Sequence, residues 1–273
     1  MIGKPSDPQS LYDAKEDIMQ FIKDYTLGSD GVVLGVSGGL DSALVLELAI
    51  EALGVDAVLC IHMPYRDLDG YWETHLEKFN KLMEHYEVSE HYVVDITRAV
   101  DHAMGELDEF YHNEKIDKGN LMARIRMAHL YFLAREPNLR VIGTSNKTEI
   151  MAGYTAKWGD NVADLEPIAH LYKTETKRLA KFMMVPDWVI KQAPTAGLWE
   201  GQTDEGEMGI TYDTLDQIFS QTINRKGQWT TDWDTSSLLR QLLYETYGAT
   251  AVDTAWELWY NSRHKREAIP QLV

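Results

Sequence analysis

The sequence of 273 residues has a single cysteine and no long apolar run. Because a disulfide needs two cysteines, Cys60 excludes an internal one, as is usual in a reducing cytosol, and we expect a cytoplasmic protein. No segment approaches the roughly 18 apolar residues of a membrane-spanning helix. The N-terminal segment lacks the basic and then apolar pattern of a secretory signal. These absences predict a protein without a membrane anchor.

Positive charge is also scarce, because 26 basic residues stand against 43 acidic ones, which gives a net charge of −17. Such a charge repels nucleic-acid phosphates, so a broad DNA or RNA surface is excluded. An anionic small molecule must therefore be held by local donors.

Short β-branched segments alternate with helical patterns in the first part of the chain. This alternation predicts a doubly wound α/β fold, a mostly parallel sheet with helices on both faces. Ligands bind such sheets at the carboxyl ends of the strands. We expect one domain, with an α/β core over 1–171 and a mainly helical part over 172–273. The predicted strands are 31–36, 55–61, 91–96 and 139–143, and the predicted helices are 11–24, 42–53, 73–84, 99–111, 120–136, 147–153, 174–184, 212–220, 236–247 and 252–262.

The strongest motif is SGGLDS, at 37–42, between the apolar segment GVVLGV and a predicted helix. Its glycines turn the chain and leave backbone N–H groups uncovered, and the helix adds its free N-terminal donors. Together they predict a phosphate or pyrophosphate site. Asp41 would oppose a bare phosphate, so its presence predicts a bridging Mg²⁺. A turn that merely caps the helix is the structural alternative.

SGGLDS resembles the PP-loop of the ATP pyrophosphatases, which have an adenine nucleotide alpha hydrolase-like fold. The resemblance implies adenylation, in which the loop holds the departing pyrophosphate while a substrate oxygen attacks the α-phosphate of ATP.

Further polar segments accompany this loop. In GNLMARIRM, Arg124 and Arg126 are two residues apart on a helix and point in different directions, so at least one faces solvent or a ligand. After the fourth predicted strand, charged residues are concentrated in GTSNKTEIMAGYTAKWGDNVADLEPIAHLYKT. That position predicts that Thr144 contacts a nucleotide and that Glu149 joins Asp41 on the metal.

Two C-terminal segments leave alternatives open. Thr195 follows a proline in a long polar loop over 193–209, which is either a lid or disordered. The basic cluster at 262–266 either binds an anion or complements a helix dipole.

These segments together are similar to the NAD synthetase family over nearly the whole chain. The resemblance implies ATP contacts, Mg²⁺ ligands at Asp41 and Glu149, and contacts to the deamidated dinucleotide. The ATP contacts fall on Gly35, Val36, Ser37, Gly38, Gly39, Leu40, Asp41, Ser42, Thr144, Lys173 and Thr195. The dinucleotide contacts fall on Arg124, Lys157, Asp164, His264 and Lys265.

The reaction so implied is amidation of nicotinic acid adenine dinucleotide (deamido-NAD) through an acyl-adenylate, with AMP and pyrophosphate as products. Asp41, Glu149 and Lys173 would offset phosphate charge, and Asp160 or Asp164 is a candidate base for the ammonium proton. Free ammonia is the expected donor, because Cys60 lies in an apolar strand and suits a buried hydrophobe, not a glutaminase nucleophile. The family also implies a homodimer.

Two rival interpretations remain. A tRNA-modifying relative would need a basic surface and, for thiolation, paired cysteines. A non-catalytic nucleotide sensor with this fold would be expected to have lost Asp41, Glu149 or Lys173, and all three are present.

Overall fold

In the computed structural model, four parallel strands form one sheet in the order β3-β2-β1-β4. The structure describes residues 7–66, 71–107, 109–110, 114–199, 201–224, 227–229 and 238–267. The strands are β1 (Gly31–Gly35), β2 (Val58–His62), β3 (His91–Val93) and β4 (Leu139–Ile142). The predicted α/β class and parallel sheet are confirmed.

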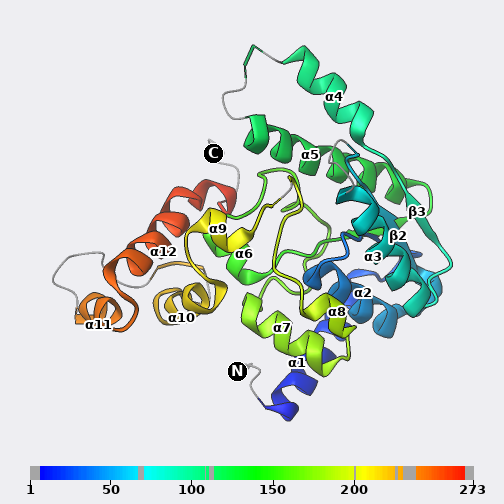
Figure 1. Ribbon diagram of the computed structural model, residues 1–273. Helices are drawn as coiled ribbons and strands as arrows, with labels where there is room; N and C mark the ends of the chain where they lie inside the picture. The colour runs from blue at the N-terminus through cyan, green and yellow to red at the C-terminus, as the bar shows by residue number, and fades with distance from the viewer. Residues whose placement is uncertain are drawn as a thin grey trace, which may run out of the picture.

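Helices cover both faces of this sheet (Figure 1). On one face α2 (Leu40–Leu53) packs in a core with α1 (Pro8–Tyr25), α3 (Tyr71–His85) and α7 (Lys173–Phe182). On the other face lie α4 (Thr97–Glu106) and α5 (Glu114–Arg135). The side chains of β1 alternate between the two cores, since Val32 and Leu34 enter the first and Val33 the second. This two-residue period is what a strand buried on both sides requires.

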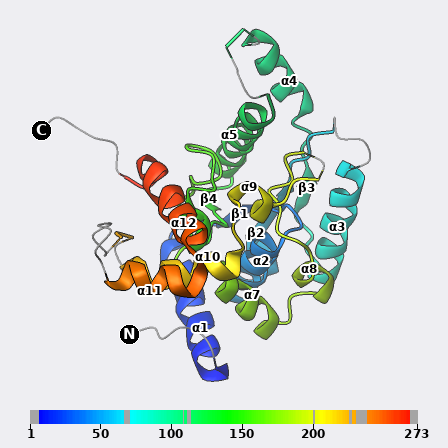
Figure 2. The same ribbon diagram turned by 60° about the vertical axis from the view of Figure 1, so that its left-hand side comes forward.

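The remaining helices are mostly gathered beside the sheet. Figures 1 and 2 show α10, α11 and α12 together at one side, far from α3. They form a third core around Leu215, Phe219 and Val252. The bounds are α6 (Lys147–Ala152), α8 (Asp187–Ile190), α9 (Asp204–Met208), α10 (Tyr212–Thr222), α11 (Leu238–Tyr247) and α12 (Ala249–Asn261), with 3₁₀ turns η1 (Val55–Ala57) and η2 (Arg263–Lys265). None of the helices in the described part of the chain is both long and apolar enough to cross a membrane.

Most differences from the predicted elements lie at their ends. The second strand begins only at Val58, because the 3₁₀ turn η1 occupies its expected start after Gly54. The short helices α8 and α9 were not predicted. The helix predicted over 99–111 ends earlier, at Glu106, because Leu107, Glu109 and Phe110 are not helical. Tyr111 and Ser236, where two predicted helices were expected to end and begin, lie outside the described residues. The division at residue 172 stays a prediction, although α7 packs in the same core as α1 and α2.

Candidate active site

The phosphate loop follows β1 directly and leads into α2. Gly38 has φ +83°, a backbone conformation that favours glycine, and a Cβ there would lie 3.1 Å from the Lys78 Cβ. The Ser37 and Ser42 hydroxyls are 3.1 Å apart, and the Gly39 N–H donates to the Ser37 oxygen at 3.2 Å. The loop is therefore closed by its own serines, at the positive end of a 14-residue helix.

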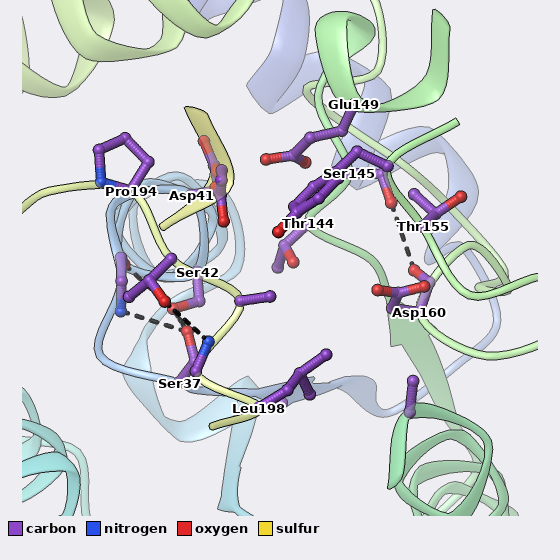
Figure 3. Close-up of a pocket in the computed structure, with 18 of the residues that line it drawn as sticks. Ser37, Asp41, Ser42, Thr144, Ser145, Glu149, Thr155, Asp160, Pro194 and Leu198 are labelled. Atoms are coloured by element: carbon purple, nitrogen blue, oxygen red, sulfur yellow. Dashed lines mark hydrogen bonds between the residues drawn. The ribbon is translucent and has the colours of Figure 1, made fainter. Parts of the chain in front are cut away.

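A cavity of about 940 Å³ opens in front of this loop, at the carboxyl ends of β1, β2 and β4. Figure 3 shows Ser37, Asp41 and Ser42 at one side of it and Thr155 and Asp160 at the opposite side. The position is the one that a parallel sheet predicts for a ligand. A cavity of this size is within the usual range for a small-molecule site.

One ammonium group joins two carboxylates in the wall of the cavity. Lys173 Nζ lies 2.5 Å from Asp41 Oδ2 and 2.9 Å from Glu149 Oε1. The three side chains come from α7, α2 and α6, and each is no more than 16 % exposed. Tyr212 lies beside them, with Lys173 Nζ 5.1 Å from the centre of its ring. Two carboxylates this close are stable in a buried place because the ammonium lies between them.

Burial and the neighbouring charges both shift the pKa values of Glu149 and Lys173. Burial, followed by the neighbouring Asp41, raises the pKa of Glu149 to about 7, although Lys173 opposes the shift. Burial alone would lower the pKa of Lys173, but the carboxylates of Asp41 and Glu149 raise it above its ordinary value. Lys173 is therefore a fixed cation at neutral pH, whereas Glu149 can change protonation there.

The loop after β4 forms another wall. Thr144 lines the cavity, and the Ser145 hydroxyl donates to the backbone oxygen of Asp160 at 3.2 Å. The Asp160 carboxylate accepts from the Ala156 N–H at 2.7 Å, and burial raises its pKa. A raised pKa moves a carboxyl group toward the range in which it can accept and release a proton.

Glu166 lies behind this wall and was not predicted from the sequence. Its Oε2 accepts from the Ser145 N–H at 3.0 Å, and its Oε1 is buried without a hydrogen-bond partner. Gly143 makes room for it, because a Cβ at that position would lie 2.2 Å from Glu166 Oε1. Burial raises the pKa of Glu166 to about 8. No sequence pattern indicates that Glu166 lies beside the cavity, since a lone glutamate after a strand is usually a surface residue.

The two arginines of α5 do point in different directions. Arg126 lines the cavity, with its Nε donating to the Met63 carbonyl at 3.0 Å. Arg124 is exposed, and its Nε donates to the Lys157 carbonyl at 3.1 Å. No pattern in the sequence distinguishes Arg126, which faces the cavity, from Arg124, which lies outside it, because either side of the helix could have faced the sheet.

Arg124 and two other predicted dinucleotide contacts meet on the surface. Lys157 Nζ lies 3.5 Å from His264 Nδ1, beside Arg124. We name Arg124, Lys157 and His264 the basic patch. Asp164 lies apart from it, since its Oδ2 accepts from the Val141 N–H at 2.8 Å and its Oδ1 from the Tyr131 hydroxyl at 3.3 Å.

Lys265 and Arg266 bind backbone oxygens at the end of α6. Lys265 Nζ donates to the carbonyls of Gly153 and Thr155, at 2.6 Å each, and Arg266 Nη1 to that of Met151 at 2.9 Å. These cations therefore contact the C-terminal end of α6 and not the end of the cluster's own helix, and anion binding by the cluster stays a prediction. Lys265 also lines the cavity.

Pro194, Thr195 and Leu198, from the described part of the predicted loop over 193–209, line the cavity. The end of this loop is helical, and the Asp204 carboxylate of α9 accepts from the Tyr212 hydroxyl at 2.9 Å. Of the predicted ATP contacts, the lining residues are Gly35, Val36, Ser37, Gly39, Leu40, Asp41, Ser42, Thr144, Lys173 and Thr195.

Known proteins resemble this chain in sequence and in fold. A model of the NAD synthase family matches residues 14–268. The NH(3)-dependent NAD(+) synthetase of Methanosarcina acetivorans is 42 % identical over 207 residues, which cover 75 % of this chain and 80 % of the relative. The enzyme of the same name from Pyrococcus horikoshii is 42 % identical over 211 residues, 77 % of this chain and 78 % of the relative.

Solved structures agree with these relatives. The NMN synthetase of Francisella tularensis has a TM-score of 0.79 at 29 % identity and covers 98 % of this chain and 99 % of its own. The NH3-dependent NAD synthetase of Campylobacter jejuni has a TM-score of 0.74 at 26 % identity, with 98 % and 100 % covered. The match to the family model over most of the chain, and relatives above 40 % identity, lead to one assignment. This chain belongs to the NAD synthase family.

Proposed function

We propose that this chain amidates deamido-NAD to NAD⁺ with ammonia at the expense of ATP. The observation that carries the proposal is the Asp41–Lys173–Glu149 cluster, which joins the phosphate loop at Asp41 and lies in the wall of the same cavity. The sequence relatives named NH(3)-dependent NAD(+) synthetase support the choice of reaction.

In the first step, an oxygen of the nicotinate carboxylate attacks the α-phosphorus of ATP, and the bond to pyrophosphate breaks. The backbone donors of the loop at 37–42 hold the departing pyrophosphate. Lys173 offsets the charge that builds on the phosphate oxygens. The products of this step are an acyl-adenylate and pyrophosphate.

In the second step, ammonia attacks the acyl carbon and AMP leaves, so that an amide and one proton are formed. We assign the acceptance of that proton to Asp160, whose carboxylate lines the cavity across from Asp41 (Figure 3). Asp164 is the weaker candidate, because both of its oxygens accept hydrogen bonds away from the cavity.

Asp41 and Glu149 would hold Mg²⁺. Asp41 Oδ1 is buried without a hydrogen-bond partner, and carboxylate oxygens are the ligands that this ion prefers. Within the described residues no group of three or more acidic, histidine or cysteine side chains could hold a metal alone, so phosphate oxygens of ATP would complete the set. Bound there, Mg²⁺ would neutralise phosphate charge.

Free ammonia is the proposed nitrogen donor. Burial raises the pKa of the Cys60 thiol to about 12, so this thiol is not a nucleophile at neutral pH. We further propose a homodimer, because α5 exposes large apolar side chains such as Phe132, which is 81 % exposed. Light scattering in solution tests the dimer. We propose a cytoplasmic location because the single cysteine suits a reducing compartment.

A second candidate substrate is nicotinic acid mononucleotide, favoured by the likeness to an NMN synthetase structure. The basic patch favours the dinucleotide, since it offers a second anion site outside the cavity.

The test gives the purified protein ATP, Mg²⁺ and ammonium chloride with either nicotinate nucleotide, and follows amide product and AMP. Equal amounts of NAD⁺ and AMP are expected, with kcat/KM at least about tenfold higher for the dinucleotide. Amidation of the mononucleotide alone would reassign the substrate. The absence of AMP with both would refute the proposed reaction.

A further inference from the structure

Thr148 and Asp216 form a buried pair that links the two helices carrying Glu149 and Lys173. The Thr148 hydroxyl, at the N-terminal end of α6, donates to Asp216 Oδ1 at 2.5 Å and accepts from the Lys173 N–H at 2.9 Å. Asp216 Oδ2 accepts from the Thr174 N–H at 2.8 Å. Thr148 is 0 % exposed and Asp216 is 4 % exposed.

These bonds lie next to the reacting groups in the chain. Thr148 precedes Glu149 directly, and its hydroxyl binds the backbone of Lys173 itself. The Lys147 N–H also donates to the Leu171 carbonyl at 2.8 Å, so the starts of α6 and α7 are joined at two points. A shift of this junction therefore moves the Glu149 carboxylate relative to the Lys173 ammonium.

Asp216 belongs to α10, and this helix contributes both Asp216 and Tyr212 to the surroundings of Lys173. Tyr212 lies one turn before Asp216 and places its ring under the Lys173 ammonium. A buried carboxylate is costly unless donors satisfy it, and here a hydroxyl and a backbone N–H at a helix start do so. Burial raises the pKa of Asp216, and the hydrogen bonds from Thr148 and Thr174 oppose that shift.

We propose that the Thr148–Asp216 pair is a positioning device that sets the Glu149 carboxylate and the Lys173 ammonium at their working separation for ATP. The inference rests on the proposed function, because it assigns these two groups to phosphate chemistry. Neither Thr148 nor Asp216 lies in the lining of the cavity that would receive ATP at the loop, so they act through their neighbours.

The decisive comparison is Thr148→Val against Thr148→Ser. Valine keeps the shape of the side chain and removes both hydrogen bonds, whereas serine keeps the hydroxyl. A matched control is Thr222→Val, which removes another fully buried hydroxyl, one that donates to the Ile218 carbonyl within α10. Asp216→Asn disturbs the same pair from the other side. The substitution replaces one carboxylate oxygen by an amide nitrogen, and that nitrogen cannot accept a hydrogen bond from the Thr174 N–H.

Thr148→Val is expected to lower kcat about 100-fold, because a displacement of about 1 Å in a positioned group has that effect. The KM for deamido-NAD should stay within about threefold of wild type, since the basic patch is untouched. Thr148→Ser should retain kcat within about threefold, and Thr222→Val should lose thermal stability but not kcat. Asp216→Asn should lower kcat about tenfold, and it replaces Thr148→Val if that variant does not fold.

ATP affinity, measured by calorimetry without the second substrate, keeps the two proposals separate. ATP binding should weaken about tenfold in Thr148→Val and in neither Thr148→Ser nor Thr222→Val. If wild type makes no NAD⁺ but shows this pattern of ATP binding, the proposed function fails and the positioning role stands. Wild-type kcat and ATP affinity in both Thr148→Val and Asp216→Asn would overturn the positioning role, as would equal losses in Thr148→Ser.

Discussion

The phosphate end of the cavity and the basic patch hold charge in opposite ways. At the phosphate end, Asp41, Glu149 and Lys173 are nearly buried and neutralise one another in part. In the patch, Arg124 and His264 are exposed, Lys157 is partly exposed, and the three have only weak mutual contacts. Buried charges must be paired to persist, whereas exposed ones are screened by solvent. We infer that the phosphate end mainly determines the rate of the chemical step, whereas the basic patch mainly determines which substrate binds.

Replacing the central cation should have the largest effect on this contrast. Lys173→Met is expected to lower kcat/KM about 1000-fold, because it removes a donor to the phosphates and leaves Asp41 and Glu149 facing each other. Steady-state rates of AMP formation measure the loss. Lys181→Met, on the exposed side of the same helix, is the control. Activity within tenfold of wild type would show that Lys173 is only a structural ion-pair partner.

Removing charge from the patch should have a smaller effect of another kind. Arg124→Ala is expected to raise the KM for deamido-NAD about tenfold and to leave the KM for ATP unchanged, because one charge-assisted hydrogen bond contributes roughly 1.5 kcal/mol. The defect should shrink as salt rises, since the site is exposed. Arg98→Ala, an exposed arginine of α4, is the control. A rise in the KM for ATP would place Arg124 at the phosphate end.

The smallest expected effect concerns the free energy of unfolding and its dependence on the ionisation of Glu166. The pKa of Glu166 is about 8 in the folded protein and near 4.5 in the unfolded chain. The folded state therefore binds more protons between these values, and stability falls as pH rises through them. Glu166→Gln cannot ionise, so its stability relative to wild type should rise from pH 5 to pH 9. The expected rise is about 1–2 kcal/mol, less than the roughly 4 kcal/mol of the full pKa difference, because the side chain is partly open to solvent. Urea unfolding at several pH values measures this, and parallel curves would contradict it.

The sequence predicts the phosphate end far better than the rest of the site. A glycine loop between a buried strand and a helix forms a phosphate site at the start of the helix, so the positions of Gly38 and Asp41 in that site could be predicted from the motif. Arg126, Glu166 and Asp216 could not, because their roles depend on which face of a helix or loop meets the sheet. Helix α9 was missed because its five residues are too few to show a period.

The same distinction holds for the fold. Buried strands and amphipathic helices of the core were recognisable from apolar spacing, and only their ends differed. The contact of Lys265 and Arg266 with α6 was beyond prediction, because no local pattern shows which helix end a distant cation will meet.

That last contact has a consequence for how the protein folds. Lys265 is 112 residues from Gly153 along the chain, and Lys173 is 132 residues from Asp41. Closing such large loops is slow and comes after local structure has formed. A chain whose sheet is assembled but whose α7 is not yet docked would have Asp41 in the glycine loop without the Lys173 ammonium. We therefore expect ATP-splitting competence to be among the last properties gained during refolding, well after most helical content has returned.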